Sequence, residues 1–192
     1  DGEILLRGES MMKGYWNLPE VTASTIIDGW LHTGDIGKFD EQGSLMITDR
    51  KKDIIVNSGG DNISPQRIEG LMTLETEISQ AMVYGDDKPY LVAVLWPDED
   101  FMREFARDND LSNDIEALGK NEDFRKIIRA AIDRVNKRLS TIEKVRSFMF
   151  AEAPFTIDNE MLTPSMKIRR HKIREAYAKQ LDGLYQRKRG GQ

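Results

Sequence analysis

The sequence contains no cysteine and only two histidines among its 192 residues. The absence of cysteine excludes disulfide bonds, catalysis by a thiol and metal sites built from thiolates. His32 and His171 lie too far apart in the sequence to suggest a metal site by their spacing. Neither residue type therefore predicts a metal centre or a covalent thiol intermediate.

Long hydrophobic runs and a net positive charge are also lacking. No stretch approaches the roughly 18–20 apolar residues that a transmembrane helix needs, and no signal peptide opens the sequence. The formal net charge of −5 argues against nucleic-acid binding across the whole surface. Basic residues do gather at 50–52 and 167–174, but charge runs of this kind are usually solvated faces. We therefore expect a cytoplasmic protein without a nucleic-acid partner.

The sequence does have enough apolar material for a core. Hydrophobic residues make up 39% of it, and 15 glycines bring the total close to that of an ordinary globular protein. The length suits one domain plus part of another. The first residue is Asp1 rather than Met, and residues 1–6 predict a turn followed by a strand. We therefore expect the sequence to begin inside a longer protein.

The first fifty residues predict short strands and turns. Residues 4–6 and 45–47 are typical of strands, residues 40–43 of a turn, and Pro19 of the start of a short helix. Elements this short could hardly bury a core alone. We interpret them as the last strands of a barrel or sheet whose other strands lie outside this sequence.

The pattern changes after Lys52. Residues 54–56 and 61–63 flank a glycine turn and predict a hairpin, and Ser64-Pro65 is typical of a helix start. Further strands are expected at 78–84, 90–96 and 147–150, and further helices after Asp98 and over 123–139 and 172–185. Because helices alternate with a few strands that can pair antiparallel, we predict a small α+β domain. The tail at 187–192 is expected to be disordered.

Several segments depart from what packing alone would require. A carboxylate beside glycine, as in residues 32–35 (HTGD), can approach a sugar closely and accept hydrogen bonds from two hydroxyls. Charged residues 49–53 suit an exposed joint between domains, and Gly59-Gly60 permits close approach of a ligand. Lys167 lies in a polar loop that could carry a point charge to a phosphate. Taken singly, each segment is more simply a turn, an empty surface hairpin or an exposed lysine.

The order of these segments along the chain is more specific than any one of them. Residues 28–52 read DGWLHTGDIGKFDEQGSLMITDRKK, with Phe39 at a position where an aromatic residue is usual, and GEI at residues 2–4 precedes them. Ser58-Gly59-Gly60 and then Thr163-Pro164 with Lys167 follow. Together they resemble the AMP-forming acyl-CoA synthetases of the adenylate-forming superfamily, in particular long-chain-fatty-acid–CoA ligases. The resemblance spans nearly the whole chain.

The resemblance implies a fold and a reaction. Residues 1–51 would be the C-terminal end of a large AMP-binding domain, and residues 52–192 its mobile C-terminal domain. The fold would be α+β, with the last strands of a barrel subdomain followed by a short antiparallel sheet flanked by helices. Such enzymes join a carboxylate to ATP, which gives an acyl-adenylate and pyrophosphate. They then pass the acyl group to the thiol of coenzyme A and release AMP.

The resemblance also implies roles for individual residues. Asp35 matches the carboxylate that holds the ribose hydroxyls, and Arg50 matches the arginine that also reaches the ribose. Lys52 matches the hinge about which the C-terminal domain swings between the half-reactions. Lys167 matches the lysine that enters the site for adenylation, where a positioned cation stabilises negative charge at the α-phosphate. Ser58, Gly59 and Gly60 would help line the channel for the pantetheine arm of coenzyme A.

The same resemblance implies parts that this sequence lacks. They are the phosphate loop, a threonine–glutamate motif for ATP and Mg²⁺, and the acyl tunnel. The chain is therefore not expected to be active alone, and its partners would be its own N-terminal domain, ATP, coenzyme A and a fatty acid. Contacts to Mg²⁺ would come from the absent part, so no metal ligand is assigned here. Long-chain specificity is inferred from the 28–52 signature and from the helical insertion between Trp96 and Phe148.

Two alternatives stay open at the level of sequence. An acyl-adenylate enzyme that loads an acyl-carrier protein would share these motifs and differ in its thiol acceptor. A non-catalytic module could keep the fold, although a relic would be free to lose Asp35, Arg50 or Lys167. No aromatic stacking platform accompanies the basic stretch 167–174, which disfavours a nucleic-acid role. A fatty substrate would also favour peripheral association with a membrane surface.

Overall fold

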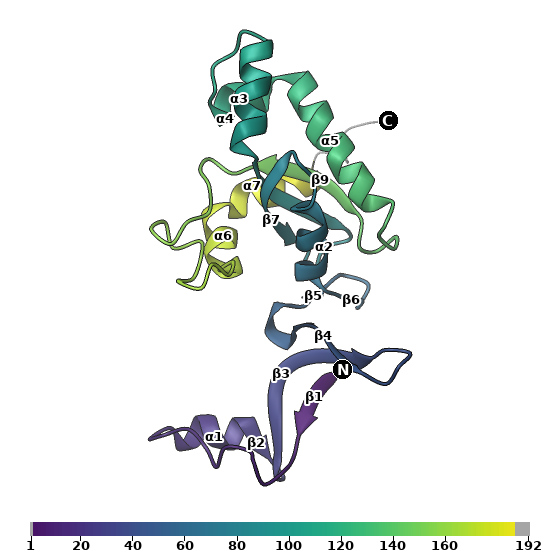
Figure 1. Ribbon diagram of the computed structural model, residues 1–192, viewed down its shortest axis with the longest axis vertical. Coiled ribbons are helices and arrows are strands. Elements are labelled where there is room, and N and C mark those ends of the chain that lie inside the picture. Colours follow the sequence, from purple (N-terminus) through teal and green to yellow (C-terminus); the bar gives the residue numbers. More distant parts are fainter. Residues whose placement is uncertain (1, 187–192) are drawn as a thin grey trace. The chain divides into compact units, whose positions relative to one another are not determined.

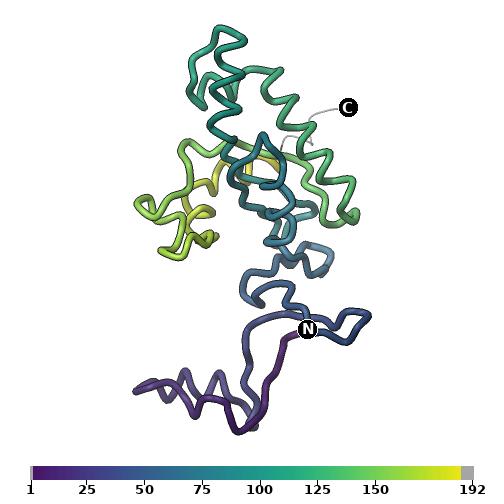
Figure 2. The backbone as a smooth tube through the Cα atoms, in the orientation of Figure 1, coloured from purple at the N-terminus to yellow at the C-terminus, as the bar shows by residue number. Residues whose placement is uncertain are grey.

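The computed structural model describes residues 2–186, and the chain divides into two compact units. The first unit ends at Ile54 and the second begins at Ile55. In Figures 1 and 2 the purple and blue part of the chain is the first unit, and the part running from blue through green to yellow is the second. The expected domain boundary after residue 51 lies slightly earlier and stays a prediction. The tail at 187–192 lies outside the described residues.

The first unit is an antiparallel sheet built around one long strand. β3 (Trp30–Phe39) pairs with β1 (Glu3–Leu6), β2 (Ile26–Ile27) and β4 (Leu45–Arg50). α1 (Pro19–Thr25) precedes β2, and Pro19 stands in its first turn, where a missing N–H costs no helical hydrogen bond. The strands expected at 4–6 and 45–47 and the short helix at Pro19 are thus confirmed.

Strand pairing rather than a core holds the first unit together. Among residues 2–54 only Asp49 is buried, while Trp16, Phe39 and Ile47 are 90%, 72% and 65% exposed. A few short strands with this little buried apolar surface do not form an independently stable core. The interpretation of these elements as part of a larger sheet stays a prediction.

The second unit contains a three-stranded sheet whose middle strand is buried throughout. β8 (Leu91–Pro97) lies between β7 (Ile78–Tyr84) and β9 (Val145–Phe150), and all its residues are buried. β7 and β8 pair antiparallel, as expected, whereas β8 and β9 pair parallel. A parallel pair needs a long crossover connection, and the helical insertion between Trp96 and Phe148 provides it.

Helices surround this sheet. They are α2 (Pro65–Met72), α3 (Glu99–Asp108), α4 (Ile115–Lys120), α5 (Glu122–Asn136), α6 (Arg170–Ala176) and α7 (Ala178–Gln186). Ser64, Asp98 and Asn121 cap α2, α3 and α5, since a side-chain oxygen of each accepts from backbone N–H groups of the first turn. The apolar stripe expected on α5 packs into the core, where Phe124, Ile128 and Ile132 are fully buried.

The single helix expected over 172–185 is two helices in the structure. The break falls at Tyr177, whose backbone leaves the helical region with φ −112° and ψ 18°. The Tyr177 side chain is buried, and its hydroxyl accepts a hydrogen bond from the Glu152 backbone N–H at 3.0 Å. This tertiary anchor, which local periodicity does not encode, accompanies the change of direction between α6 and α7.

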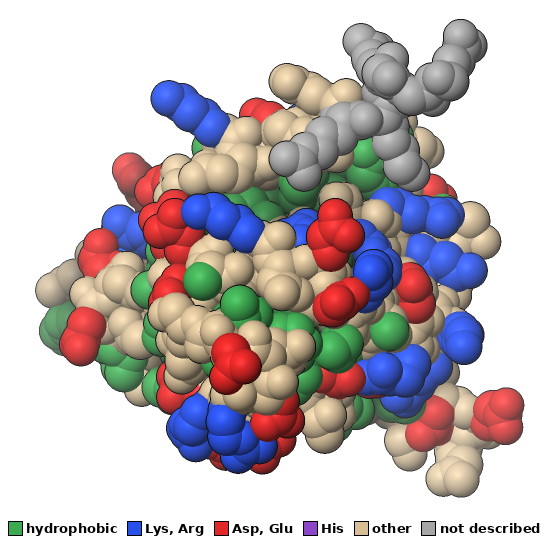
Figure 3. All heavy atoms as spheres, turned by 90° about the horizontal axis from the view of Figure 1, so that it is seen from above, with side chains coloured by type: hydrophobic (Ala, Val, Ile, Leu, Met, Phe, Trp, Pro, Cys, Tyr) green, Lys and Arg blue, Asp and Glu red, His purple; other side chains and the backbone are tan. Residues whose placement is uncertain are grey.

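The surface of the described chain carries both signs of charge. Figure 3 shows Lys and Arg side chains interspersed with Asp and Glu side chains on one face. Within residues 2–186, no helix has the length and apolar character needed to cross a membrane.

A buried ion pair joins α2 to the start of α6. Arg170 donates from Nη1 and Nη2 to the two carboxylate oxygens of Glu69, at 2.5 and 3.0 Å. The same carboxylate accepts from the Val83 backbone N–H at 2.7 Å, and the Glu69 and Arg170 side chains are 8% and 20% exposed. A two-pronged contact of this kind fixes orientation as well as distance. It attaches the segment that precedes α6, which contains Lys167, to the core of the second unit.

We predict that Glu69→Gln lowers the free energy of unfolding by about 3 kcal/mol, because it leaves the Arg170 guanidinium buried without its counter-charge. Urea unfolding followed by far-UV circular dichroism measures the change. Glu116→Gln is the matched control. Glu116 pairs with Lys120 at 2.7 Å, but these side chains are 81% and 73% exposed, so the loss should stay below about 0.5 kcal/mol. Equal losses in the two variants would contradict the anchoring role of the buried pair.

Candidate functional site

Asp35 and Arg50 lie side by side on the adjacent strands β3 and β4 of the first unit. They are directly opposite in the antiparallel pair of β3 and β4, and Arg50 Nε lies 2.9 Å from Asp35 Oδ1. The side chains are 27% and 50% exposed, so the pair is reachable from solvent. The structure therefore brings together, as an ion pair, the two residues that the resemblance assigns to the ribose.

A bulge in β3 carries Asp35. Leu5 pairs with His32 and Glu3 pairs with Ile36, so β3 has extra residues between these two points of contact with β1. Gly34 adopts φ +70°, a region that glycine enters at little cost. Bulges of this kind re-aim a side chain relative to the regular pleat. The glycine before Asp35 is therefore needed for the backbone to turn the carboxylate toward Arg50.

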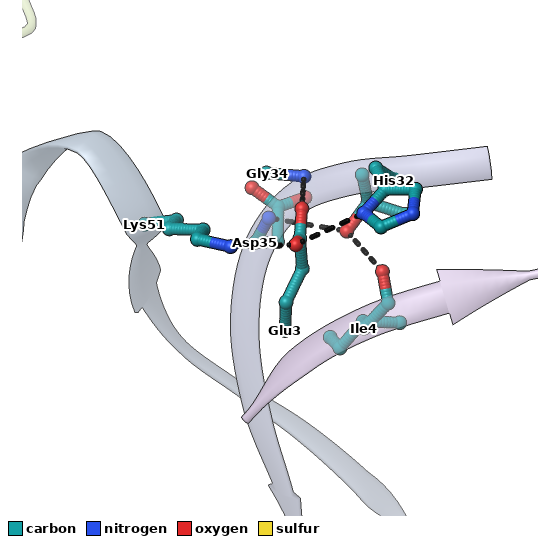
Figure 4. Close-up of polar contacts among 7 residues, drawn as sticks. Glu3, Ile4, His32, Gly34, Asp35 and Lys51 are labelled. Carbon is teal, nitrogen blue, oxygen red and sulfur yellow. Dashed lines mark hydrogen bonds and ion pairs between the residues drawn. The ribbon is translucent and has the colours of Figure 1, made fainter. Parts of the chain in front are cut away.

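The Glu3 carboxylate lies beneath this bulge and uses both of its oxygens (Figure 4). Oε1 accepts from the Gly34 backbone N–H at 3.0 Å, while Oε2 lies 2.9 Å from Lys51 Nζ and 3.2 Å from His32 Nδ1. The Glu3 side chain is only 8% exposed. Hydrogen bonds from Lys51 and then from His32 lower the pKa of Glu3 from 4.5 to about 2. The carboxylate is thus ionised at neutral pH.

Thr33 adds a second tie between β1 and the bulge. Its hydroxyl donates to the Ile4 carbonyl oxygen at 2.7 Å and accepts from the Asp35 backbone N–H at 3.1 Å. Figure 4 shows Glu3 and Ile4 of β1 facing the curved part of β3 at His32 and Gly34. Thr33 therefore ties the residue before Gly34 to β1 and the residue after it to the Thr33 side chain.

The glycine hairpin of the second unit is organised by Asn57. This residue joins β5 (Ile55–Val56) to the turn before β6 (Asn62–Ile63), and its side chain is buried. Asn57 Oδ1 accepts from the backbone N–H groups of Gly59 and Asp61, both at 2.9 Å. Its Nδ2 donates to Asp61 Oδ2 at 2.9 Å. An asparagine that binds the backbone two residues ahead closes the turn from within.

The hairpin is also fastened to the turn that joins β7 to β8. The Ser58 backbone N–H donates to the Lys88 carbonyl oxygen at 3.1 Å, and the Val56 N–H donates to Asp86 Oδ1 at 3.1 Å. Gly60 has φ +84°, and a Cβ built there would meet no atom within 4 Å. The loop is therefore held from one side, while its tip at Gly60 opens into free space.

Lys167 is exposed at the end of a tight loop. The Lys167 backbone N–H donates to Thr163 Oγ1 at 3.0 Å, and the Thr163 N–H donates to the Lys167 carbonyl oxygen at 2.8 Å. Leu162 and Ile168 form an isolated antiparallel bridge that closes the loop. Within residues 2–186 the Lys167 ammonium has no ion-pair partner. A firmly held backbone thus carries a cation that is free to bind an anion.

Lys52 lies in the 3₁₀ helix η1 (Lys51–Asp53), between β4 and β5. Its side chain is exposed. The site residues assigned from the sequence therefore fall into two groups. Asp35 and Arg50 lie in the first unit, whereas the hairpin 58–60 and Lys167 lie in the second.

Two structural partners of the site were missed at the level of sequence. Glu3 belongs to the motif quoted above, but its donors lie 29 to 48 residues away, so no local spacing marks its role. Asn57 could have been found, because asparagine two residues before glycine is a common turn signal. Within residues 2–186, no three His, Asp or Glu side chains gather in a way that could hold a metal ion.

We predict that Lys51→Met raises the pKa of Glu3 toward its ordinary value, because the bond from Lys51 is the largest cause of its lowering. The folded-state pKa lies below the unfolded one. The network therefore stabilises the fold above about pH 4.5 and loses that contribution as the pH falls toward 2. Carboxyl ¹³C NMR titration measures the pKa. Lys38→Met, at an exposed lysine of β3, is the control and should leave it unchanged. A Glu3 pKa near 2 in Lys51→Met would contradict the assignment.

Comparison with known proteins identifies relatives over most of the chain. A family model described as the C-terminal domain of AMP-binding enzymes matches residues 52–189. Long-chain-fatty-acid–CoA ligase FadD15 of Mycobacterium tuberculosis is 36% identical over 187 residues, which cover 96% of this chain and 31% of that protein. Human long-chain-fatty-acid–CoA ligase 1 is 35% identical over 189 residues, covering 96% of this chain and 27% of that protein.

Solved structures show the same fold. The adenylation domain of a carboxylate reductase from Mycobacterium chelonae superposes with a TM-score of 0.81 at 27% identity, covering 96% of this chain and 28% of that one. Amide bond synthetase McbA from Marinactinospora thermotolerans gives 0.61 at 29% identity, covering 92% and 30%. The chain thus spans less than a third of the curated relatives it matches. Because the family model covers most of its length, the chain belongs to the family of AMP-binding enzyme C-terminal domains.

Proposed function

We propose that the chain is the C-terminal part of a long-chain fatty acyl-CoA synthetase. The complete enzyme would use ATP to convert a fatty acid to its acyl-adenylate, and would then form the thioester with coenzyme A. The main support is the similarity, over 96% of this chain, to proteins named long-chain-fatty-acid–CoA ligases. The geometry of Asp35, Arg50 and Lys167 suits the chemistry that this reaction requires.

Asp35 and Arg50 would bind the ribose of the nucleotide. A carboxylate can accept hydrogen bonds from two neighbouring hydroxyls, and Asp35 is accessible enough to do so. Arg50 forms an ion pair with Asp35 through Nε, and its guanidinium carries five N–H donors, so others of them could reach oxygen atoms of the sugar. The pair would thus present a hydrogen-bond acceptor and a hydrogen-bond donor side by side to the ribose hydroxyl groups.

Lys167 would stabilise the transition state of adenylation. Negative charge builds at the α-phosphate as the carboxylate attacks, and a positioned ammonium lowers the energy of that charge. A contact to the attacking carboxylate oxygen would also orient it. The exposed ammonium on a rigid loop suits a group that must enter a site and leave it again, because withdrawal breaks no ion pair within the described chain.

The hairpin 58–60 would serve the second half-reaction. With Lys52 as the hinge, rotation of residues 52–192 would withdraw Lys167 and bring the hairpin to the active site, a hinge-type conformational step. The Gly60 tip has open space around it, so the pantetheine arm could pass close to the backbone. The hairpin's ties to Lys88 and Asp86 would keep this wall of the channel in place.

Mg²⁺ and the acyl chain are assigned no residue of this chain. Among residues 2–186 no three His, Asp or Glu side chains gather in a way that could hold a metal ion, so we assign no metal ligand to them. We expect the magnesium contacts, the phosphate loop and the acyl tunnel in the N-terminal part of the enzyme. The chain would therefore be inactive by itself, and its own N-terminal domain would be its main protein partner. Cytoplasmic location with peripheral membrane association is part of the same proposal.

An acyl-adenylate enzyme that loads a carrier protein is the second candidate. One similar solved structure, at 25% identity and a TM-score of 0.79, is an A-PCP didomain of a carboxylic acid reductase from Segniliparus rugosus. The two candidates differ in the thiol that accepts the acyl group, which is either coenzyme A or a phosphopantetheinyl protein. A non-catalytic module is disfavoured, because it would have no reason to keep the Asp35–Arg50 pair and an unpaired Lys167 together.

We predict that Lys167→Ala in the complete enzyme slows adenylation by about 100-fold or more, because a charge-stabilising group is lost from the transition state. Pyrophosphate release measures this step. Transfer from supplied acyl-adenylate to coenzyme A should survive within a few-fold. Lys179→Ala, at an exposed lysine of α7, is the control and should leave both steps unchanged. Survival of both steps in Lys167→Ala would make Lys167 an ordinary loop lysine, and equal loss of both would indicate a folding defect.

We predict that Gly60→Leu slows acyl transfer to coenzyme A by about tenfold or more and leaves adenylation within a few-fold, because its side chain would occupy the channel. Gly43→Leu is the matched control. Gly43 also has positive φ, +81° against +84°, and neither glycine has an atom within 4 Å of its built Cβ. Backbone strain is therefore similar in the two variants. If Gly43→Leu slows transfer as much, the effect is strain rather than obstruction, and the channel assignment is wrong.

A further inference from the structure

We propose that Glu3 is a positioning residue for the nucleotide site, which holds Asp35 and Arg50 ready to bind the ribose. This inference rests on the proposed function, because it assigns a role toward the nucleotide that Asp35 would bind. The contacts described above join Glu3 to Gly34, Lys51 and His32. Glu3 acts on the backbone and side chain of the neighbouring residues, Gly34 and Lys51.

The first support is the placement of the three donors. Gly34 immediately precedes Asp35 on β3, and Lys51 immediately follows Arg50 at the end of β4. One carboxylate therefore contacts a neighbour of each member of the pair, at 3.0 and 2.9 Å. His32, at 3.2 Å, extends the contact to the other side of the bulge (Figure 4). Few single side chains could restrain two strands at their functional residues in this way.

The second support is that the bulge needs a tether. Its backbone departs from the regular ladder, and Gly34 lies at φ +70°, where many alternative backbone angles are open to glycine. A hydrogen bond from Gly34 N–H to an ionised acceptor is stronger than one between neutral groups. With that bond in place the bulge has one conformation, and the Asp35 carboxylate points to Arg50.

The third support is the weakness of the Asp35–Arg50 contact on its own. Ion pairs between side chains as exposed as these contribute little, since holding two mobile side chains in one geometry costs conformational entropy. A binding site gains affinity when its side chains are already ordered before the ligand binds, because less conformational entropy is then lost on binding. Glu3 is placed to do this, because its side chain is 8% exposed and contacts Gly34 and Lys51, the chain neighbours of Asp35 and Arg50.

A purely structural Glu3 and a positioning Glu3 differ in one measurable property. Loss of a structural residue would weaken the binding of every nucleotide by a similar factor, through partial unfolding. Loss of a positioning residue would reduce the part of the affinity that comes from the ribose hydroxyls. The contrast between AMP and 2′,3′-dideoxy-AMP isolates that part, because the two nucleotides share the adenine and the phosphate.

The test is isothermal titration of the complete enzyme with each of these nucleotides. In Glu3→Gln, which keeps the shape and an acceptor for Gly34, AMP should bind about tenfold more weakly, and dideoxy-AMP within twofold of the wild type. Asp40→Asn is the matched control. Asp40 Oδ1 accepts from the backbone N–H groups of Gln42 and Ser44, at 2.9 and 2.8 Å. These residues form the turn between β3 and β4, at the other end of these strands from Asp35 and Arg50. That variant should leave the ratio of the two affinities unchanged.

Lys51→Gln removes the exposed partner of the same contact. It provides a second test in case Glu3→Gln fails to fold. Like Glu3→Gln, it should reduce the ratio of the AMP affinity to the dideoxy-AMP affinity. Equal weakening of both nucleotides in the two variants, or no weakening, overturns the role of Glu3. Asp35→Asn separates this failure from that of the proposed function. If Asp35→Asn brings the affinity for AMP down to that for dideoxy-AMP while Glu3→Gln leaves the ratio of the two affinities unchanged, only the inference on Glu3 falls. If Asp35→Asn also preserves it, Asp35 does not bind the ribose, and both are overturned.

Discussion

The antiparallel pairing of β3 with β4 is the constraint on which the candidate nucleotide site depends. It sets Asp35 opposite Arg50, and the bulge beside it turns the carboxylate toward the guanidinium. Almost no apolar burial supports this part of the chain, since among residues 2–54 only Asp49 is buried. Polar contacts therefore have an unusually large share in its geometry. The Glu3 carboxylate, with donors from β3 and from the residue that follows β4, is the centre of those contacts.

The second unit is built on the opposite principle. Its middle strand β8 is buried along its whole length, and a packed apolar core surrounds it. The candidate functional segments lie outside this core but are each fastened to it. The Glu69–Arg170 ion pair attaches the start of α6, which follows the Lys167 loop, and the turn between β7 and β8 holds the glycine hairpin. A rigid body with two exposed functional segments suits a domain proposed to present different surfaces in successive steps.

The two candidate sites differ in whether their charged side chains form ion pairs. In the first unit the functional charges are paired, Asp35 with Arg50 and Glu3 with Lys51. Paired charges suit a site that must keep its shape while it recognises a neutral sugar. In the second unit, the Lys167 ammonium is exposed and makes no ion pair within the described residues. An unpaired ammonium is free to bind a phosphate and to leave it again without breaking a contact inside the protein.

The sequence by itself determined the division into an edge of strands and a small α+β domain, most helices and strands, and the candidate residues Asp35, Arg50 and Lys167. The elements depend on local patterns, such as apolar periodicity, Ser64-Pro65 at a helix start and glycine turns, which act over a few residues. The candidate residues were assigned through the resemblance, which rests on the order of motifs along the chain. Only the tertiary structure decided the parallel pairing of β9, the break at Tyr177, and the partners of Glu3 and Glu69. Their physical cause is contact between segments 25 to 101 residues apart, which no local pattern encodes.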